Sequence, residues 1–196
     1  MTRDKIIQVS IELFANTGFQ NTSLKDIATG VGIKKPSLYN HFESKEDIFL
    51  TVLEEVKTRE VDAIRKEITY SDKATTEKKL KQIFDTYTEL MTDSTEGQLF
   101  KRVTFFPPDE FSEEIKQVFL RIEEEITAII TPVLEEGMAT NQLCKWNIST
   151  LLSAFYTTMD GLFLEEHFYG KNVLSKRKKA SWEVFWAGIV MKEKEE

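Results

Sequence analysis

Residues 22–49 read Thr-Ser-Leu-Lys-Asp-Ile-Ala-Thr-Gly-Val-Gly-Ile-Lys-Lys-Pro-Ser-Leu-Tyr-Asn-His-Phe-Glu-Ser-Lys-Glu-Asp-Ile-Phe, the most informative stretch of the chain. It predicts two short helices separated by a glycine turn, followed by the start of a third. Ser23 and Asp26 have the spacing of a capping box, so the first short helix begins there. Pro36 suits the first turn of the second, which is short, polar and predicted over about 35–41. Such a helix, held rigidly, fits the major groove of DNA.

Helical periodicity extends through the rest of the chain. Apolar residues recur at the spacing of amphipathic helices, and a first helix is predicted over about 2–17, with Gly18 as its C-terminal stop. Glycine and proline are scarce, at 8 and 4, which disfavours all-β architectures and long linkers. Hydrophobic residues make up 41% of the 196 residues, enough for a sizeable core. We therefore predict an all-α protein of about nine helices.

Composition also indicates the compartment. The single cysteine, Cys144, excludes an intramolecular disulfide framework and fits a reducing cytoplasm. No stretch approaches the roughly 20 apolar residues of a membrane span, and the N-terminus lacks a signal-peptide core, so we expect a cytoplasmic protein with no membrane partner. The net charge is −7, and basic and acidic residues balance within 1–50. The remaining acidic part should keep nonspecific DNA affinity low, so DNA would be bound through a local basic cluster.

Several short groups of residues in the N-terminal segment have a distinctive order and spacing. They are Leu13-Phe14, Gly18-Phe19, Thr22-Ser23, Ile27-Ala28, Gly32-Ile33, Leu38-Tyr39, His41-Phe42 and Ser44-Lys45-Glu46. Through these groups the segment resembles the TetR family of bacterial transcriptional regulators. The resemblance implies an N-terminal three-helix helix-turn-helix DNA-binding domain over 1–47. It also implies a larger helical effector-binding and dimerisation domain over 48–196, and a homodimer that binds a palindromic operator in double-stranded DNA.

Three residues depart from the family pattern. Lys34 stands where the family often has a small capping residue, Pro36 where glycine is common, and Val31 where alanine is usual. Pro36 is compatible with the first turn of a helix, and Lys34 adds positive charge at the DNA-facing end. We interpret these differences as tuning which operator is bound.

Candidate DNA-binding residues divide into phosphate contacts and base contacts. Lys35, Ser37 and Asn40 are candidates for base readout, since asparagine can pair with adenine and lysine can reach guanine. Tyr39 resembles the family's tyrosine that reaches the backbone or a thymine methyl group. The candidate phosphate partners are Ser23, Lys34, Lys35, Ser37, His41 and Lys45. Each lysine alone could be an ordinary solvated charge, and only the clustering favours DNA contact.

The resemblance also implies an effector pocket among the fifth to eighth helices. Fourteen phenylalanines favour an apolar, partly aromatic cavity for a small lipophilic or aromatic molecule, although the same residues could form a filled core. The candidate lining residues are Phe84, Tyr87, Met91, Phe100, Val103, Phe106, Phe119, Ile122, Phe155, Tyr156 and Met159. In the family, the last two helices pair with their copies across a two-fold axis. The candidate interface residues are Phe163, Trp182, Phe185, Trp186 and Ile189.

Two other functions compete with DNA-binding regulation. The sequence offers few residues in an arrangement suited to catalysis. His41 and His167 are far apart in sequence, Cys144 has no base nearby, and neither the spacing of metal ligands nor that of a phosphate-binding loop occurs. We therefore expect neither an enzyme nor a bound cofactor or metal. The alternative is a helical small-molecule sensor or partner-binding protein without DNA binding. That protein would have a degraded recognition helix, whereas the segment over 35–41 is intact and basic.

Overall fold

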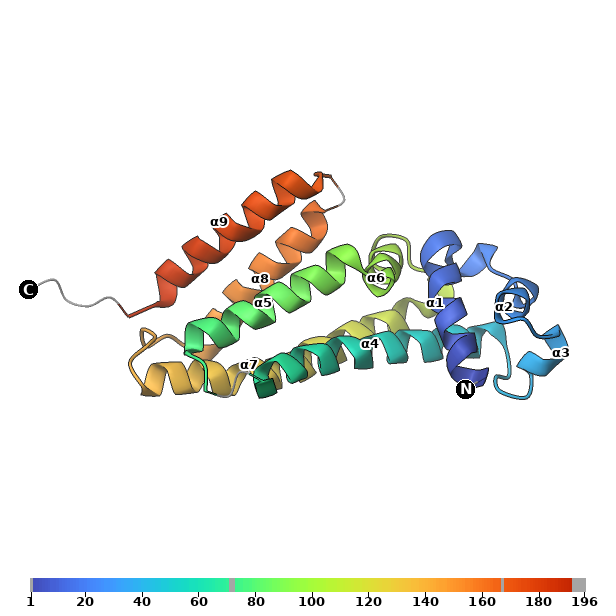
Figure 1. Cartoon of the computed structure of the whole chain (residues 1–196), viewed down its shortest axis with the longest axis horizontal. Coiled ribbons are helices and arrows are strands. Elements are labelled where there is room, and N and C mark those ends of the chain that lie inside the picture. The colour runs from blue at the N-terminus through green and yellow to red at the C-terminus, as the bar shows by residue number, and fades with distance from the viewer. Residues whose placement is uncertain (1, 71–72, 167, 192–196) are drawn as a thin grey trace, which may run out of the picture. The chain divides into compact units, whose positions relative to one another are not determined.

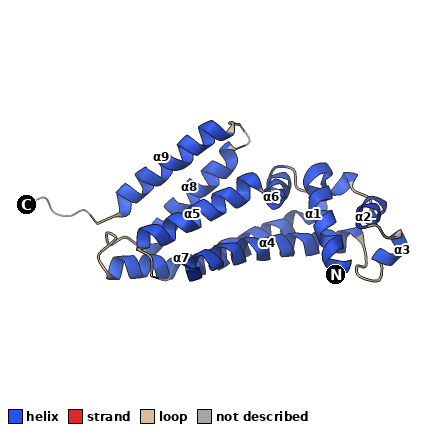
Figure 2. Cartoon of the chain, in the orientation of Figure 1, coloured by secondary structure: helices blue, strands red, loops and turns tan. Residues whose placement is uncertain are grey.

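The computed structural model describes residues 2–70, 73–166 and 168–191, and every regular element in these ranges is a helix (Figure 2). The α-helices within them are α1 (Thr2–Asn21), α2 (Leu24–Val31), α3 (Lys35–Leu38), α4 (Lys45–Tyr70), α5 (Thr76–Asp93), α6 (Thr95–Phe105), α7 (Ser112–Ala139), α8 (Ile148–Glu165) and α9 (Lys171–Ile189). A short 3-10 helix, η1 (Asp109–Phe111), precedes α7. The predicted all-α fold is confirmed, as is the number of α-helices, counted over these described ranges.

The chain folds into two compact units. Unit 1 comprises Met1–Glu60 and Asp93–Ile122, and unit 2 comprises Val61–Thr92 and Glu123–Glu196. Unit 1 therefore holds α1, α2, α3 and α6 together with the first parts of α4 and α7 (Figure 1). Unit 2 holds α5, α8, α9 and the remaining parts of α4 and α7. None of the described helices is both long and apolar enough to cross a membrane.

An aromatic cluster forms much of the core of unit 1. Phe14 and Phe19 of α1 contact Phe49 of α4, with ring centroids 5.3 and 4.9 Å away. Phe111 of η1 closes the cluster, 5.1 Å from Phe19. Since each ring is almost fully buried, the cluster joins the end of α1 to the start of α4 through apolar packing.

Helix α1 differs from its prediction at the C-terminal end. The helix continues to Asn21 across a kink at Gly18, where φ is 82° and ψ is 167°. Glycine adopts this positive φ without the steric cost that a side chain would impose. The predicted helix stop at Gly18 is therefore confirmed, and a short second helical segment follows it to Asn21.

The core of unit 2 is also aromatic. Phe84 of α5 lies 6.2 Å from Phe155 of α8 and 5.5 Å from Trp182 of α9, measured between ring centroids. Phe185 lies 5.3 Å from Phe155 and packs beside Trp182. Helices α8 and α9, which contribute three of these rings, lie side by side (Figure 1).

Candidate nucleic-acid interface

Helix α2 begins with the predicted capping box. The amide of Asp26 donates to the Ser23 hydroxyl at 3.2 Å, and the amide of Ser23 donates to the Asp26 carboxylate at 2.9 Å. The Ser23 hydroxyl also donates to that carboxylate at 2.6 Å, and the Ser23 hydrogen bonds lower the pKa of Asp26. The hydroxyl proton that was predicted to reach a phosphate therefore has an intramolecular acceptor in this structure.

Replacing Ser23 with alanine should lower the free energy of unfolding by about 1 kcal/mol, the typical value of an N-terminal cap. Urea denaturation followed by circular dichroism measures the change. Ser23→Asn keeps a side-chain acceptor at the cap and serves as the control, so it should retain most of the stability. An equal loss of unfolding free energy in the two variants would show that the side-chain acceptor at the cap does not stabilise the protein.

Two glycines shape the junction between α2 and α3 for different reasons. Gly32 has a φ of 81°, and its amide donates to the Ala28 carbonyl at 3.0 Å, which ends α2. Gly30 allows close packing, since a Cβ there would lie 2.6 Å from the Cγ1 of Val9 in α1. The turn that aims α3 is thus specified by backbone conformation and by contact with α1.

Helix α3 is shorter than predicted. It spans Lys35–Leu38, and the amide of His41 then donates to the Leu38 carbonyl at 2.9 Å in a turn. Lys34 occupies the N-cap position, with Pro36 in the first turn as predicted. The prediction over 35–41 is correct at the start of the helix and wrong at its end. Buried Leu38 anchors the segment to the core of unit 1.

The segment 34–41 exposes most of its polar side chains. Lys34, Lys35, Asn40 and His41 are exposed, and Tyr39 is 53% exposed. The remaining candidate here, Ser37, is half-buried. Within the described ranges neither Lys34 nor Lys35 forms an ion pair. The segment therefore presents cationic and hydrogen-bonding groups to the outside from a short, anchored scaffold, as direct readout in a groove requires.

Lys45, at the start of α4, is placed differently. Its ammonium donates to the carbonyl of Phe19 at 2.8 Å and lies 4.0 Å from the centroid of the Phe19 ring. These contacts tie α4 to the end of α1, so Lys45 has a structural role that sequence spacing does not indicate. An exposed cation that was not predicted from the sequence is Arg3, whose guanidinium lies 5.1 Å from the ring centroid of Phe42. No local pattern links residues so far apart in the chain.

The candidate effector residues are divided between the two units. Those in unit 1 are Phe100, Val103, Phe106, Phe119 and Ile122; those in unit 2 are Phe84, Tyr87, Met91, Phe155, Tyr156 and Met159. In unit 1, Phe100 packs against Phe119 at 5.2 Å, whereas Phe106 is 75% exposed. A cavity of about 100 Å³ in unit 1 includes Val103 and Phe106 in its lining, but not Phe100, Phe119 or Ile122.

Two tyrosines of unit 2 form hydrogen bonds beside the apolar residues. The Tyr87 hydroxyl donates to Asp160 at 2.8 Å, and desolvation raises the pKa of Asp160. The Tyr156 hydroxyl donates to the carbonyl of Glu123 at 3.0 Å and lies 2.9 Å from the Thr127 hydroxyl. Burial raises the pKa of Tyr156 to about 12. Tyr156 is therefore a neutral hydrogen-bonding group at neutral pH.

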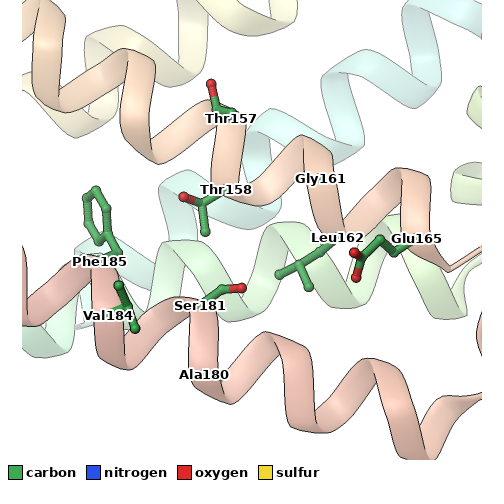
Figure 3. Close-up of a pocket in the computed structure, with 9 residues that line it drawn as sticks. All are labelled: Thr157, Thr158, Gly161, Leu162, Glu165, Ala180, Ser181, Val184 and Phe185. Carbon is green, nitrogen blue, oxygen red and sulfur yellow. The ribbon is translucent and has the colours of Figure 1, made fainter.

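The candidate dimer residues lie at different depths. Trp182 and Ile189 are 6% and 5% exposed within the single chain, whereas Phe163, Phe185 and Trp186 are half-buried. An open groove of about 550 Å³ runs between α8 and α9 (Figure 3). Its lining consists mostly of small and apolar side chains: Thr157, Thr158, Gly161, Leu162, Glu165, Ala180, Ser181, Val184 and Phe185. Of the five candidates, only Phe185 lines this groove.

The groove residues could have been found from a weaker signal. Thr157 and Gly161 are four residues apart in α8, as are Ala180 and Val184 in α9, so each pair lies on one face of its helix. The prediction from sequence chose large aromatic side chains, and Phe185 is its one candidate among the residues that line the groove. No metal-binding group of three or more acidic, histidine or cysteine side chains occurs within the described ranges, and His167 lies outside them.

Comparison with known proteins identifies the N-terminal segment. Residues 6–52 match the family described as bacterial regulatory proteins, tetR family. The biofilm operon icaADBC HTH-type negative transcriptional regulator IcaR of Staphylococcus aureus (strain Newman) is 53% identical over 47 residues. That match covers 24% of this chain and 25% of IcaR, so the chain matches these curated relatives over about a quarter of their length.

The fold as a whole resembles solved structures at low sequence identity. A transcriptional regulator from Saccharomonospora viridis in complex with choline has a TM-score of 0.80 at 18% identity, covering 97% of this chain and 98% of that one. FadR from Bacillus subtilis in complex with stearoyl-CoA has a TM-score of 0.73 at 20% identity, covering 94% and 98%. These likenesses show a shared fold over nearly the whole chain.

Proposed function

We propose that this chain, whose residues 6–52 match the TetR family, is a ligand-responsive transcriptional regulator that binds DNA. Its mode of action would be repression, as in the negative regulator IcaR, which shares about half of its residues over the matched segment. The observation that carries the proposal is the exposed, cationic segment 34–41, anchored by Leu38 and aimed by the Gly32 turn. Residues 1–47 form the proposed DNA-binding domain, and 48–196 the effector-binding and dimerisation domain.

In the proposed complex, segment 34–41 enters the major groove. Lys35, Ser37 and Asn40 would read base edges. Lys34, Tyr39 and His41 would contact the DNA backbone and so fix the register of the segment. Ser23 would donate its hydroxyl proton to a phosphate oxygen in place of the Asp26 carboxylate, and Lys45 would donate the ammonium hydrogens that its bond to Phe19 leaves available. Such contacts would supply affinity through counterion release, which makes binding steeply salt-dependent.

The operator would be palindromic because the regulator would be a homodimer. The open groove between α8 and α9 supports this proposal, since Gly161 has open space around its Cβ position and Val184 is 74% exposed. A second copy could lay its own helices into the groove, and a symmetric contact would cover the same residues on both chains. Two recognition segments would then lie one helical turn of DNA (~34–36 Å) or more apart.

A small apolar or aromatic effector would release the operator. Phe84, Phe155, Met91 and Met159 supply apolar surface in unit 2, and the hydroxyl of Tyr87 supplies a polar group that can orient a ligand. The fold accommodates ligands of several kinds, because structures that share it hold choline and stearoyl-CoA. A thermal-shift screen should include lipophilic, aromatic, acyl-CoA and quaternary ammonium compounds. The effector proposal fails if no compound both raises the melting temperature and releases bound DNA.

Selection of bound duplexes from a random DNA pool tests the regulator proposal as a whole. We expect an enriched palindrome whose half-site spacing reflects two recognition segments. Recovery of no sequence at low ionic strength would favour the alternative of a helical sensor or partner-binding protein that does not bind DNA.

Replacing Tyr39 with alanine should weaken binding to the selected duplex by about 10-fold or more, the range expected for one side chain in a specific interface. Because Tyr39 is 53% exposed, its loss should leave the melting temperature almost unchanged. Fluorescence anisotropy with labelled duplex measures the affinity. Tyr39→Phe is the control, since it separates the hydroxyl from the ring, and unchanged affinity in the alanine variant would remove this residue from the interface.

A further inference from the structure

The carbonyl groups around the kink in α1 accept hydrogen bonds from side chains. Arg102 of α6 donates through Nε to the carbonyl of Ala15 and through Nη2 to the carbonyl of Asn16, each at 2.9 Å. Thr22 donates to the carbonyl of Gly18 at 2.8 Å. The C-terminal end of a helix carries partial negative charge, so a guanidinium is well suited to this position.

The guanidinium lies directly against the kink. A Cβ at Gly18 would come within 3.2 Å of Nη1 of Arg102, so the absence of a side chain permits this approach. One planar guanidinium spans two successive carbonyls, and an ammonium group, being a point donor, cannot reproduce that geometry. The contact is therefore directional, and it fixes the position of α6 relative to the end of α1 more closely than a simple charge attraction would.

Chain connectivity links this contact to elements on both sides of it. Helix α6 follows α5 of unit 2 after the single residue Ser94, whose hydroxyl accepts from the amide of Gly97 at 2.8 Å. On the other side, α1 leads into α2 after the two residues Thr22 and Ser23. A displacement of α6 thus acts on the short segment that leads directly into the helix-turn-helix.

We propose that Arg102 is a positioning residue that couples α6 to the helix-turn-helix by holding the kinked end of α1. The proposal rests on the proposed function, because it concerns how DNA binding is regulated. A shift of α6 that breaks the two carbonyl bonds frees the end of α1 and loosens the orientation of α2 and α3. Since coupling between sites is reciprocal, DNA bound at α3 must in turn stabilise α6.

Hydrogen–deuterium exchange of the free protein tests the contact without DNA. Arg102→Ala should speed amide exchange in residues 15–31 while leaving α8 and α9 unchanged, and Arg102→Lys should restore only part of the protection. Gln98→Ala, an exposed position on the same helix, is the matched control and should behave like the parent. Unchanged exchange in residues 15–31 would overturn the proposal whether or not the parent binds DNA.

Binding to the selected duplex tests the coupling. Arg102→Ala should reduce affinity about 10- to 100-fold, as expected for losing charge-assisted hydrogen bonds. The slope of log affinity against log salt concentration should be the same for Arg102→Ala as for the parent. Removal of a phosphate partner would instead lower that slope by about 0.9. Saturating duplex should slow exchange in α6 of the parent but not of Arg102→Ala.

The outcomes separate this proposal from the proposed function. A parent protein that binds no duplex ends the regulator proposal, and the coupling with it. A parent that binds DNA while Arg102→Ala retains full affinity, or a reduced salt slope in that variant, overturns the positioning role and leaves DNA binding intact.

Discussion

Replacing Lys34 and Lys35 together with glutamate should reduce affinity for the selected duplex by roughly 1,000-fold, the largest effect expected at the DNA interface. Both ammonium groups are exposed and form no ion pair within the described ranges, so both are available to DNA. Good base contacts are worth about 1–3 kcal/mol each, and a lysine that no longer neutralises a phosphate releases no counterion. Two carboxylates would in addition repel the phosphate backbone. Anisotropy titrations at several salt concentrations measure both the affinity and its salt slope.

The control for this variant changes the net charge equally at another place. Lys73→Glu with Lys145→Glu alters two exposed lysines of unit 2 and should leave most of the affinity. If both double variants lost affinity to the same extent, the effect would be one of overall charge, and segment 34–41 would not be the reading surface. The neutral variant Lys34→Gln with Lys35→Gln should lower the salt slope by up to about 1.8, since each phosphate that is no longer neutralised accounts for about 0.9.

Replacing Val184 with glutamate should separate the proposed dimer. Val184 is 74% exposed in the single chain, so a carboxylate there costs the isolated fold almost nothing. In a symmetric interface each protomer would bury one such carboxylate without a cationic partner, at a cost of several kcal/mol. Dimer affinity should therefore fall by at least about 100-fold, and palindrome binding should fall with it, because a monomer engages only one half-site. Sedimentation equilibrium over a concentration series measures the association.

A control outside the groove distinguishes local from general effects. Leu120→Glu also places a carboxylate at an exposed apolar position, but on α7, and should leave the association unchanged. A Val184→Glu protein that remains fully dimeric would exclude the α8–α9 groove as the interface. Trp182 and Ile189 are less informative targets, since both are already buried in the single chain and their replacement would damage the core.

Local interactions are what the sequence alone determined. The capping box of Ser23 and Asp26, the αL turn at Gly32 and the start of α3 at Pro36 each involve groups a few residues apart. Such hydrogen bonds and backbone preferences act within one or two turns, so their sequence spacing predicts them directly. Helical periodicity likewise predicted an all-α chain. The match of residues 6–52 to the family then agrees with a resemblance that rested on the same local motifs.

Contacts between distant residues were decided only by the tertiary structure. The residues around Arg102 in the sequence do not indicate that it bonds to the end of α1. Likewise, the residues around Lys45 do not indicate its contacts with the ring and carbonyl of Phe19. An amphipathic stripe shows that a face is buried, but not which element covers it. For this reason Trp182 was assigned from the sequence to the dimer interface, while its packing against Phe84 within one chain required the fold.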